Sequence, residues 1–329
     1  MRSIKIAGLA LLAVLVAVLV APQVVSAHEK WFVDGGSYPV RWELLFSWPV
    51  LAALVVGAGA LVVLAVLRRV VGDPFWPNPD WLKPINSSAQ AVVGIQTAIS
   101  LVFMTVQGWL FAPKLNLPDG VGGILLSVIM LFVAWTLITG WLSRLGGGLL
   151  IMLVVVALLI FPPAFVLEQA LFVGIGGYFL IMGRGLFRPA GEVVKRLDAF
   201  WSKYKRHAIP IMRIGTGVSI LTLAFTEKLL NPDLALAFLR DYPNFNFMHL
   251  LGFDWFSNEL FIFAAGAVET AVGLMLIAGI LPRVVILFMW VPFNIAIPLL
   301  PPEELLGHLP ILAVMYAIFL ESPKGEVAV

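Results

Sequence analysis

The sequence predicts an all-α protein that crosses a membrane many times. Of its 329 residues, 61% are hydrophobic and only 12% are charged, and the mean hydropathy is +1.00. Charged residues make up about a quarter of an average soluble domain. Long apolar segments recur from residue 44 to residue 320, and Lys and Arg concentrate in alternate polar stretches between them. This combination is typical of a polytopic membrane protein.

The N-terminus has the three parts of a secretory signal peptide. Arg2 and Lys5 precede an apolar run over residues 6–20, and small residues follow up to Ala27. This pattern predicts that residues 1–27 are a signal peptide cleaved after Ala27. Cleavage would make His28 the mature N-terminus. The alternative is an uncleaved anchor, because residues 6–25 are long enough to span a bilayer.

Nine apolar segments follow, and each predicts a transmembrane helix, for which about 20 residues are needed. They are residues 44–67, 91–111, 121–141, 149–161, 164–182, 209–229, 258–281, 284–299 and 305–320. The fourth and the eighth are short, and each ends at a proline pair, Pro162-Pro163 or Pro301-Pro302. We expect these pairs to form tight turns at the outer surface.

The distribution of cations predicts the orientation. If the mature N-terminus is outside, most Lys and Arg lie in the inner segments, as the positive-inside rule requires. The C-terminus is then inside, and the expected location is the cytoplasmic membrane. In residues 191–207, apolar side chains recur at helical spacing, and Lys and Arg occupy the opposite side of the expected helix. They predict an amphipathic helix that lies on the inner membrane surface and contacts lipid.

The chain also predicts two similar halves. Residues 28–89 form an outer segment, the first span and an inner loop, and residues 189–208 form a cytoplasmic linker. The units are residues 90–188 and 209–329, with four spans each. Both place a proline pair before a final helix, and both contain a related motif, KLNLPD or KLLNPD. Because each unit has an even number of spans, the two should have the same orientation, as parallel repeats do.

The second unit carries a family resemblance. The stretch AVETAVGLMLIAGILPRVVILFMW, residues 267–290, resembles the DoxX/DoxD family of four-helix membrane proteins through Glu269, Gly273, Gly279 and Arg283. EKLLNPD resembles the end of the family's first helix, so the similarity covers about residues 209–321. The first unit departs from the pattern, because it has no Glu in its second span and Arg144 comes with a Gly-Gly-Gly loop. It looks like a degenerate copy.

The resemblance implies a redox-linked role in the membrane. Some family members are subunits of thiosulfate:quinone oxidoreductase, and others are membrane partners in thiol or oxidative-stress systems. This chain has no cysteine, which excludes disulfides, thiolate metal sites and CxxC redox chemistry. Any redox role must therefore use a bound cofactor, such as a quinone, or a metal with other ligands.

Glu269 is the first candidate site residue. It lies near the middle of its span, where a charged side chain costs about 2.5–3.5 kcal/mol on insertion scales. It should therefore face the helix bundle, as a proton relay, as a contact for a ligand, or as a neutral carboxyl hydrogen-bonded between helices. We expect its partner among Glu227, Lys228, Asn294 and His308. Glu227, Lys228 and Asn294 are the candidate residues for binding a cofactor.

Three histidines suggest a second candidate site. In the predicted topology, His28, His249 and His308 all lie on the outer side. The free amine and imidazole of His28 could close a chelate ring on a metal ion. Copper would be favoured over zinc by such nitrogen ligands. Taken alone, each histidine is more often a packing or interface residue than a metal ligand.

Three functions are compatible with these features. The first is a redox-linked membrane protein that binds a quinone or a metal at its outer face and acts with a membrane or exported partner protein. The second is a non-enzymatic scaffold for an exported complex. The third is a transporter of a small solute or metal, which is less favoured because only the span at 284–299 shows proline interruptions. No feature predicts a nucleic-acid partner.

Overall fold

The computed structural model describes residues 33, 37–71, 85, 88–183, 192–296 and 302–321, and every element in this part is a helix. The predicted signal peptide and His28 lie outside the described residues. The N-terminal part consists of η1 (Trp42–Phe46) and α3 (Trp48–Val71). The next helices are α5 (Ala89–Val106), α6 (Val121–Thr139), α7 (Ser143–Ile160), α8 (Pro163–Leu167), α9 (Ala170–Met182) and α10 (Glu192–Ser202).

The second half continues from α11 (Ala208–Leu223) directly into a π-helical segment, η4 (Ala224–Leu229). After α12 (Pro232–Asp241) comes the long α14 (Asn258–Ala278), and the last two helices are α15 (Pro282–Ala296) and α16 (Pro302–Glu321). Short turns complete the connections: η3 (Lys205–His207), η5 (Pro243–Phe245) and α13 (Phe247–Leu250).

The prediction of an all-helical membrane protein is confirmed. Five helical stretches of the described residues are long and apolar enough to cross a bilayer: Ala89–Val106, Val121–Thr139, Ser143–Ile160, Lys205–Leu229 and Asn258–Ala278. Three shorter apolar helices accompany them, Trp48–Val63, Ala170–Met182 and Leu305–Leu320. Each of the nine predicted segments overlaps a helix in the described part of the chain.

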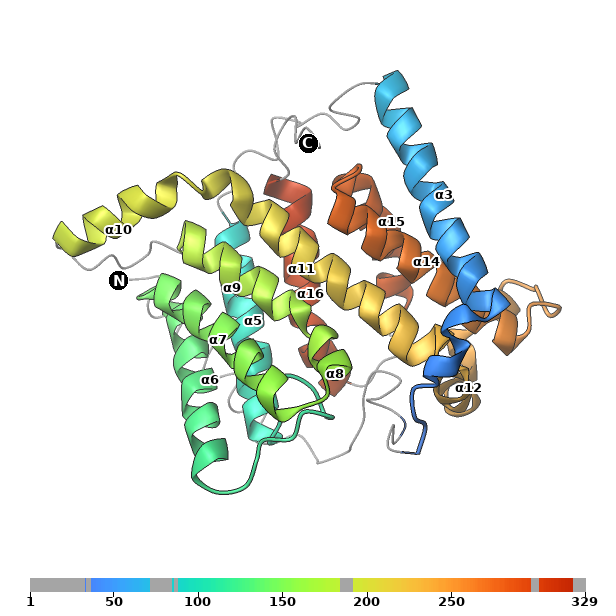
Figure 1. Cartoon of the computed structure of the whole chain (residues 1–329), viewed down its shortest axis with the longest axis horizontal. Coiled ribbons are helices and arrows are strands. Elements are labelled where there is room, and N and C mark those ends of the chain that lie inside the picture. Colours follow the sequence, from blue (N-terminus) through green and yellow to red (C-terminus); the bar gives the residue numbers. More distant parts are fainter. Residues whose placement is uncertain are drawn as a thin grey trace.

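Eight of these helices form a closed ring. In the order α5, α6, α7, α9, α11, α14, α15 and α16, each packs against the next, and α16 returns to α5. The remaining long helix, α3, lies outside the ring against α14 (Figure 1). Neighbours run in opposite directions where contacts fix them: Ser88 of α5 meets Tyr316 of α16, and Ser100 meets Leu306. This alternation is what successive membrane spans require.

Glycines set the spacing within half of the ring. A methyl group on Gly176 of α9 would lie 2.7 Å from the carbonyl oxygen of Gly147 in α7. The same conflict arises between α9 and α11 at Gly215, and between α11 and α14 at Gly217. Small residues allow the backbones of membrane helices to approach closely, so that van der Waals contact holds them together. The run α7–α9–α11–α14 is therefore joined at consecutive glycine crossings.

Two arginines hold the ends of the last helices in the two halves. Arg144 donates to the carbonyls of Leu180, Ile181 and Met182 at the end of α9. Arg283 donates to the carbonyls of Phe319 and Leu320 at the end of α16. A cation at this position satisfies carbonyls that lack a partner within the helix and complements the helix dipole.

Two details of the sequence prediction were wrong. The three glycines at 146–148 are not a loop but lie inside α7. There Gly147 packs directly against the backbone of α9 at Gly176. The turn is instead at Gly140–Leu142, where Gly140 ends α6 in a left-handed conformation. The predicted span at 164–182 is also not continuous, since α8 ends at Leu167 and α9 begins at Ala170.

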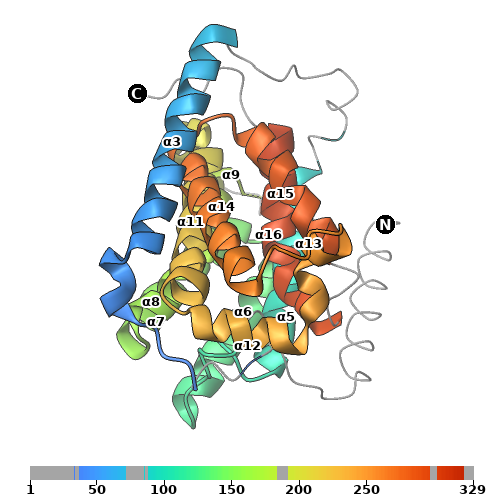
Figure 2. The same cartoon turned by 90° about the vertical axis from the view of Figure 1, so that its right-hand side faces the viewer.

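The two ends of the bundle differ in charge and in the short helices they carry. The amphipathic α10 projects from the same end at which α3 finishes (Figure 1), and this end also carries Arg144 and Arg283. At the opposite end, α12 crosses below α11 and α14 (Figure 2). The cation-rich end is the one that the positive-inside rule would place in the cytoplasm.

The orientation is testable by labelling cysteines, because the chain has none of its own. Ser202 at the end of α10 and Asn244 in the opposite loop are both exposed. We expect an impermeant thiol reagent to label Asn244→Cys but not Ser202→Cys on intact cells, and both after permeabilisation. Labelling of position 202 alone on intact cells would reverse the predicted orientation.

The glycine crossings predict a sharp contrast between two substitutions. Gly217→Ala places a methyl group against the Gly273 carbonyl, and overpacking of this kind costs about 1–3 kcal/mol. Gly59 of α3 has no atom within 4 Å of the added methyl group, so Gly59→Ala should leave stability unchanged or raise it slightly. Thermal unfolding in detergent should show a lower Tm for the first variant only. An equal Tm for both would contradict a constraint at this crossing.

Candidate functional site

The candidate site is built on the π-helical segment η4, Ala224–Leu229, at the end of α11. A π-helix contains an extra residue in the turn, and such segments occur frequently at functional sites. Here the segment carries three consecutive polar residues, Thr226, Glu227 and Lys228. Thr226 and Glu227 are each 1% exposed. Because consecutive residues point in different directions around the helix, these side chains reach different neighbours.

Thr226 reaches across to the irregular start of α9. Its hydroxyl donates to the Oε1 of Glu168 at 2.6 Å, and Glu168 is buried. Glu168 lies between α8 and α9, where the helix is interrupted. The backbone carbonyl of Glu168 accepts a hydrogen bond from the Ser219 hydroxyl of α11. The interrupted helix is thus stabilised by side chains of α11, as buried polar backbone groups require.

Lys228 reaches the opposite neighbour, α14. Its Nζ lies 3.3 Å from the Oε1 of Glu269, near the middle of that 21-residue helix. This confirms Lys228 among the partners predicted for Glu269. The Lys228 side chain is 14% exposed and that of Glu269 is 35% exposed. The pair is therefore largely withdrawn from solvent, and the second carboxylate oxygen of Glu269, Oε2, is buried without a hydrogen-bond partner among the described residues.

Glu227 adds a second carboxylate next to this pair. It is almost completely buried and directly precedes Lys228 in the chain. A carboxyl group can hold a proton as a donor or release it and act as an acceptor. The group formed by Glu168, Thr226, Glu227, Lys228 and Glu269, which we call the η4 cluster, therefore combines groups that exchange protons with groups that donate hydrogen bonds.

The chain before α3 covers the end of η4. The backbone N–H of Arg41 donates to the Leu230 carbonyl at 2.8 Å, and the Asn231 side chain donates to the Tyr38 carbonyl at 2.9 Å. The Arg41 guanidinium is also paired with Asp233 at 3.3 Å. These contacts place the segment 38–41 over the end of the cluster. They bring together residues that are almost 200 positions apart in the chain.

The structure also places two of the three predicted histidines. His249 lies in the loop before α14, where its Nε2 is 2.9 Å from the Phe256 carbonyl and 3.3 Å from the Asn246 amide. His308 is half-buried in the first turns of α16. His28 and the side chain of Asn294 lie outside the described residues. In the part of the chain that is described, no three His, Asp or Glu side chains are arranged to hold a metal ion.

The metal site therefore stays a prediction, since it depends on His28. The loop contacts of His249 agree with the alternative that this histidine has a packing role. With Asn246, which also donates to the Phe256 carbonyl and to Asn258, it fixes the loop between α12 and α14.

No protein-family model matches the chain, and neither does any curated protein or solved structure. The resemblance to the DoxX/DoxD family accordingly rests on the residues that carry it, above all Glu269, Gly273, Gly279 and Arg283. The structure adds one observation about two of them. Gly273 is the α14 side of a glycine crossing, and Gly279 lies so close to Arg213 that a side chain would clash with its guanidinium.

The sequence gives no reason to single out Thr226 on its own. It predicts Glu168 to be a carboxylate at the membrane interface, because Glu168 lies just after a proline pair, one turn into an apolar segment. Its burial depends on a break in the helix, and a break has no composition signal when the flanking residues are apolar. The stretch Thr226-Glu227-Lys228 did hold a signal, since three consecutive polar residues inside a predicted span cannot all face lipid.

A double-mutant cycle tests whether Lys228 and Glu269 stabilise each other. Removing one partner leaves an uncompensated charge, which costs about 3–5 kcal/mol in a buried site. We expect Lys228→Met and Glu269→Leu each to lower the Tm strongly, and the double variant to lower it less than the sum of the two. Strictly additive effects would show that the two side chains are not coupled in the folded protein.

Proposed function

We propose that this protein is an integral membrane protein that exchanges protons at the η4 cluster in support of a redox reaction of a membrane-dissolved quinone. The observation that carries the proposal is the Lys228–Glu269 pair near the middle of a span, with the buried Glu227 beside it. Intramembrane ionisable groups of this kind are costly and are typical of proton and ligand pathways. A quinone reaches such a depth because it dissolves in the bilayer.

The residues of the cluster fit the chemistry of a quinone headgroup. A bound quinone would supply two carbonyl oxygens, and its reduction to a quinol takes up two electrons and two protons. Lys228 carries donors suited to a carbonyl oxygen, while Glu227 and Glu269 can hold and release protons. The buried Oε2 of Glu269, which has no hydrogen-bond partner among the described residues, is the acceptor that a quinol hydroxyl would meet.

We propose that a membrane or exported partner protein delivers the electrons, while this chain binds the quinone and handles protons. The lack of cysteine, which excludes thiol redox chemistry within this chain, supports the division. This division agrees with the role that the resemblance to the DoxX/DoxD family implies.

We further propose that the chain consists of two related four-helix units, residues 90–188 and 209–329. Three correspondences support this. Leu142 and Leu281 are the two described residues other than glycine with positive φ, and each follows a left-handed glycine, Gly140 or Gly279. Each leucine is followed two positions later by an arginine that holds the end of the last helix of its unit. The same offset in the sequence relates Pro162-Pro163 to Pro301-Pro302.

The contacts between the units are reciprocal. Ser219 of the second unit donates to the Glu168 carbonyl at the start of α9, and Ser100 of the first donates to the Leu306 carbonyl at the start of α16. In both cases the first helix of one unit packs against the last helix of the other. A pair of units related by an approximate two-fold axis along the bundle produces this pattern, as parallel repeats do.

Proton-coupled transport is the second candidate, and one observation favours it. The interruption at Glu168 and the π-helical segment η4 lie side by side, and each carries a buried carboxylate. Discontinuous helices with polar groups at the break form the binding sites of many transporters. The sequence had suggested that such breaks were absent outside the span at 284–299.

Infrared difference spectroscopy tests the redox proposal directly. Protein in nanodiscs that contain ubiquinone or menaquinone is reduced electrochemically, and the carboxyl stretching region is recorded. We expect reduction to change the protonation of at least one carboxyl group, and Glu269→Gln to remove this signal. Glutamine keeps the shape of the side chain and its hydrogen-bonding capacity but cannot ionise, so the fold should persist.

The control is Asp254→Asn, which neutralises an exposed carboxylate in the loop before α14. This variant should leave the difference spectrum unchanged. If the wild-type protein shows no carboxyl signal on quinone reduction, the redox proposal is wrong. A carboxyl signal that instead follows a pH gradient and the addition of a solute would favour transport.

A further inference from the structure

The amphipathic helix α10, Glu192–Ser202, presents a surface that the bundle does not use. It lies at the cation-rich end and projects sideways from the start of α11 (Figure 1). At 100° per residue, its apolar side chains gather on one side and its basic side chains on the other. An in-plane helix at the end of a membrane bundle lies where headgroups meet acyl chains.

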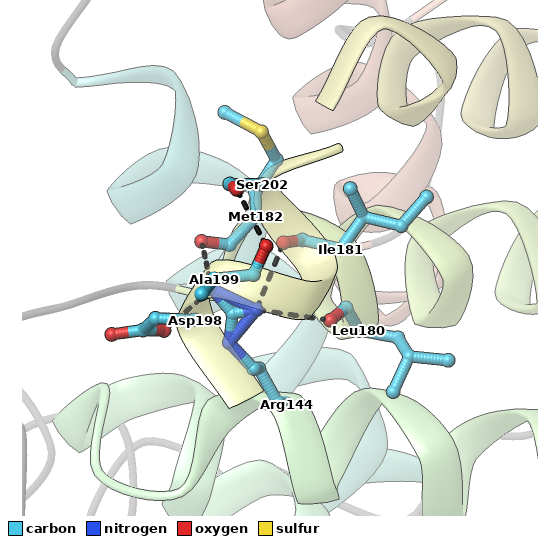
Figure 3. A network of polar contacts seen from close by, with 7 residues as sticks. All are labelled: Arg144, Leu180, Ile181, Met182, Asp198, Ala199 and Ser202. Atoms are coloured by element: carbon cyan, nitrogen blue, oxygen red, sulfur yellow. Dashed lines mark hydrogen bonds and ion pairs between the residues drawn. The ribbon is translucent and has the colours of Figure 1, made fainter. Parts of the chain in front are cut away.

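A polar network fixes how α10 is rotated about its own axis. Asp198 lies 2.8 Å from Arg144, which also holds the carbonyls at the end of α9 (Figure 3). On the same side, Trp201 packs against the core of the bundle. Because Asp198 and Trp201 face the bundle, the residues on the remaining faces cannot be turned inward without breaking the ion pair.

The outward faces combine apolar and basic side chains. Leu197 and Phe200 are each 48% exposed and Tyr204 is 42% exposed. Lys195, Arg196 and Lys203 are exposed as well. Arg196 precedes Phe200 by four positions, so the two lie next to each other on the helix surface. Asp198 is paired with Arg144 on the side of α10 that faces the bundle.

We propose that α10 is a binding site for anionic phospholipid headgroups of the adjacent leaflet. Leu197 and Phe200 enter the acyl-chain boundary, while Arg196 and its neighbouring lysines bind the phosphates. The charge of the surface selects this partner, because a zwitterionic headgroup gains little from three clustered cations, whereas an anionic surface attracts each of them. The site is separate from the η4 cluster, which lies toward the opposite end of the bundle.

The experiment uses the full-length protein, which has no cysteine, with a single environment-sensitive label. Leu197→Cys places the label on the apolar face, and Ala199→Cys places it on the polar face as a control. Each protein is reconstituted in nanodiscs of phosphatidylcholine, with or without phosphatidylglycerol, that contain a nitroxide-labelled lipid. The nitroxide quenches a label that enters the acyl-chain boundary.

We expect phosphatidylglycerol to increase the quenching at position 197 and to leave position 199 unchanged. The increase should disappear at high salt, because salt screens exposed charges. Neutralising Lys195, Arg196 and Lys203 to Gln should lower the docked-to-undocked ratio at least about fivefold, which is the effect of one cation at an anionic surface. Arg240→Gln, an exposed cation at the other end, should not change it.

Two results would overturn the proposal. One is equal quenching at position 197 in the two kinds of nanodisc. The other is a phosphatidylglycerol effect that persists both at high salt and in the neutralised variant, because such an effect would not depend on the charge of these three side chains. The salt series needs no substitution on α10 other than the label, so it decides the question even if the neutralised variant fails to fold.

Discussion

The close approach of α7, α9, α11 and α14 is the constraint on which the rest of the structure depends. Within a bilayer, burying apolar side chains gives no driving force for association, because lipid is as apolar as they are. Contact between backbones at glycine supplies it instead. At Gly217, an added methyl group would lie 2.7 Å from the Gly273 carbonyl. These crossings hold α11 between α9 and α14, with no room for a shift in register.

That fixed register is what assembles the η4 cluster. Thr226 meets Glu168 on one side of α11, and Lys228 meets Glu269 on the other. Along α11 both contacts lie about two to three turns beyond Gly217, so a small rotation of α11 would separate both pairs together. The extra residue of the π-helical segment lets neighbouring positions serve opposite partners. Tight packing at one level of the bundle thus permits an irregular, polar arrangement at another.

Much of this could be predicted from the sequence, for identifiable reasons. The spans were evident because apolar runs long enough to cross a bilayer are rare outside membrane helices. The Glu269–Lys228 pair could be anticipated because a charge inside a span needs a partner from a neighbouring helix. The break before α9, however, depends on Ser219 and Thr226 of another helix, which stabilise Glu168. No local pattern around Glu168 could reveal contacts that exist only through the fold.

If the chain consists of the two proposed units, the position of Glu269 can be compared with the equivalent position in the first unit. The offset that relates Arg144 to Arg283 places Met130 where the second unit has Glu269. Met130 is fully buried and contacts the Thr105 hydroxyl through its sulfur at 3.7 Å. The first unit therefore fills with an apolar side chain the position at which the second unit holds a carboxylate. The two reciprocal interfaces share the contact of a serine hydroxyl with a backbone carbonyl, and at the one formed by α9 and α11 the carboxylate of Glu168 also accepts from Thr226. In the function that we propose, the second unit exchanges protons and the first serves as its packing partner.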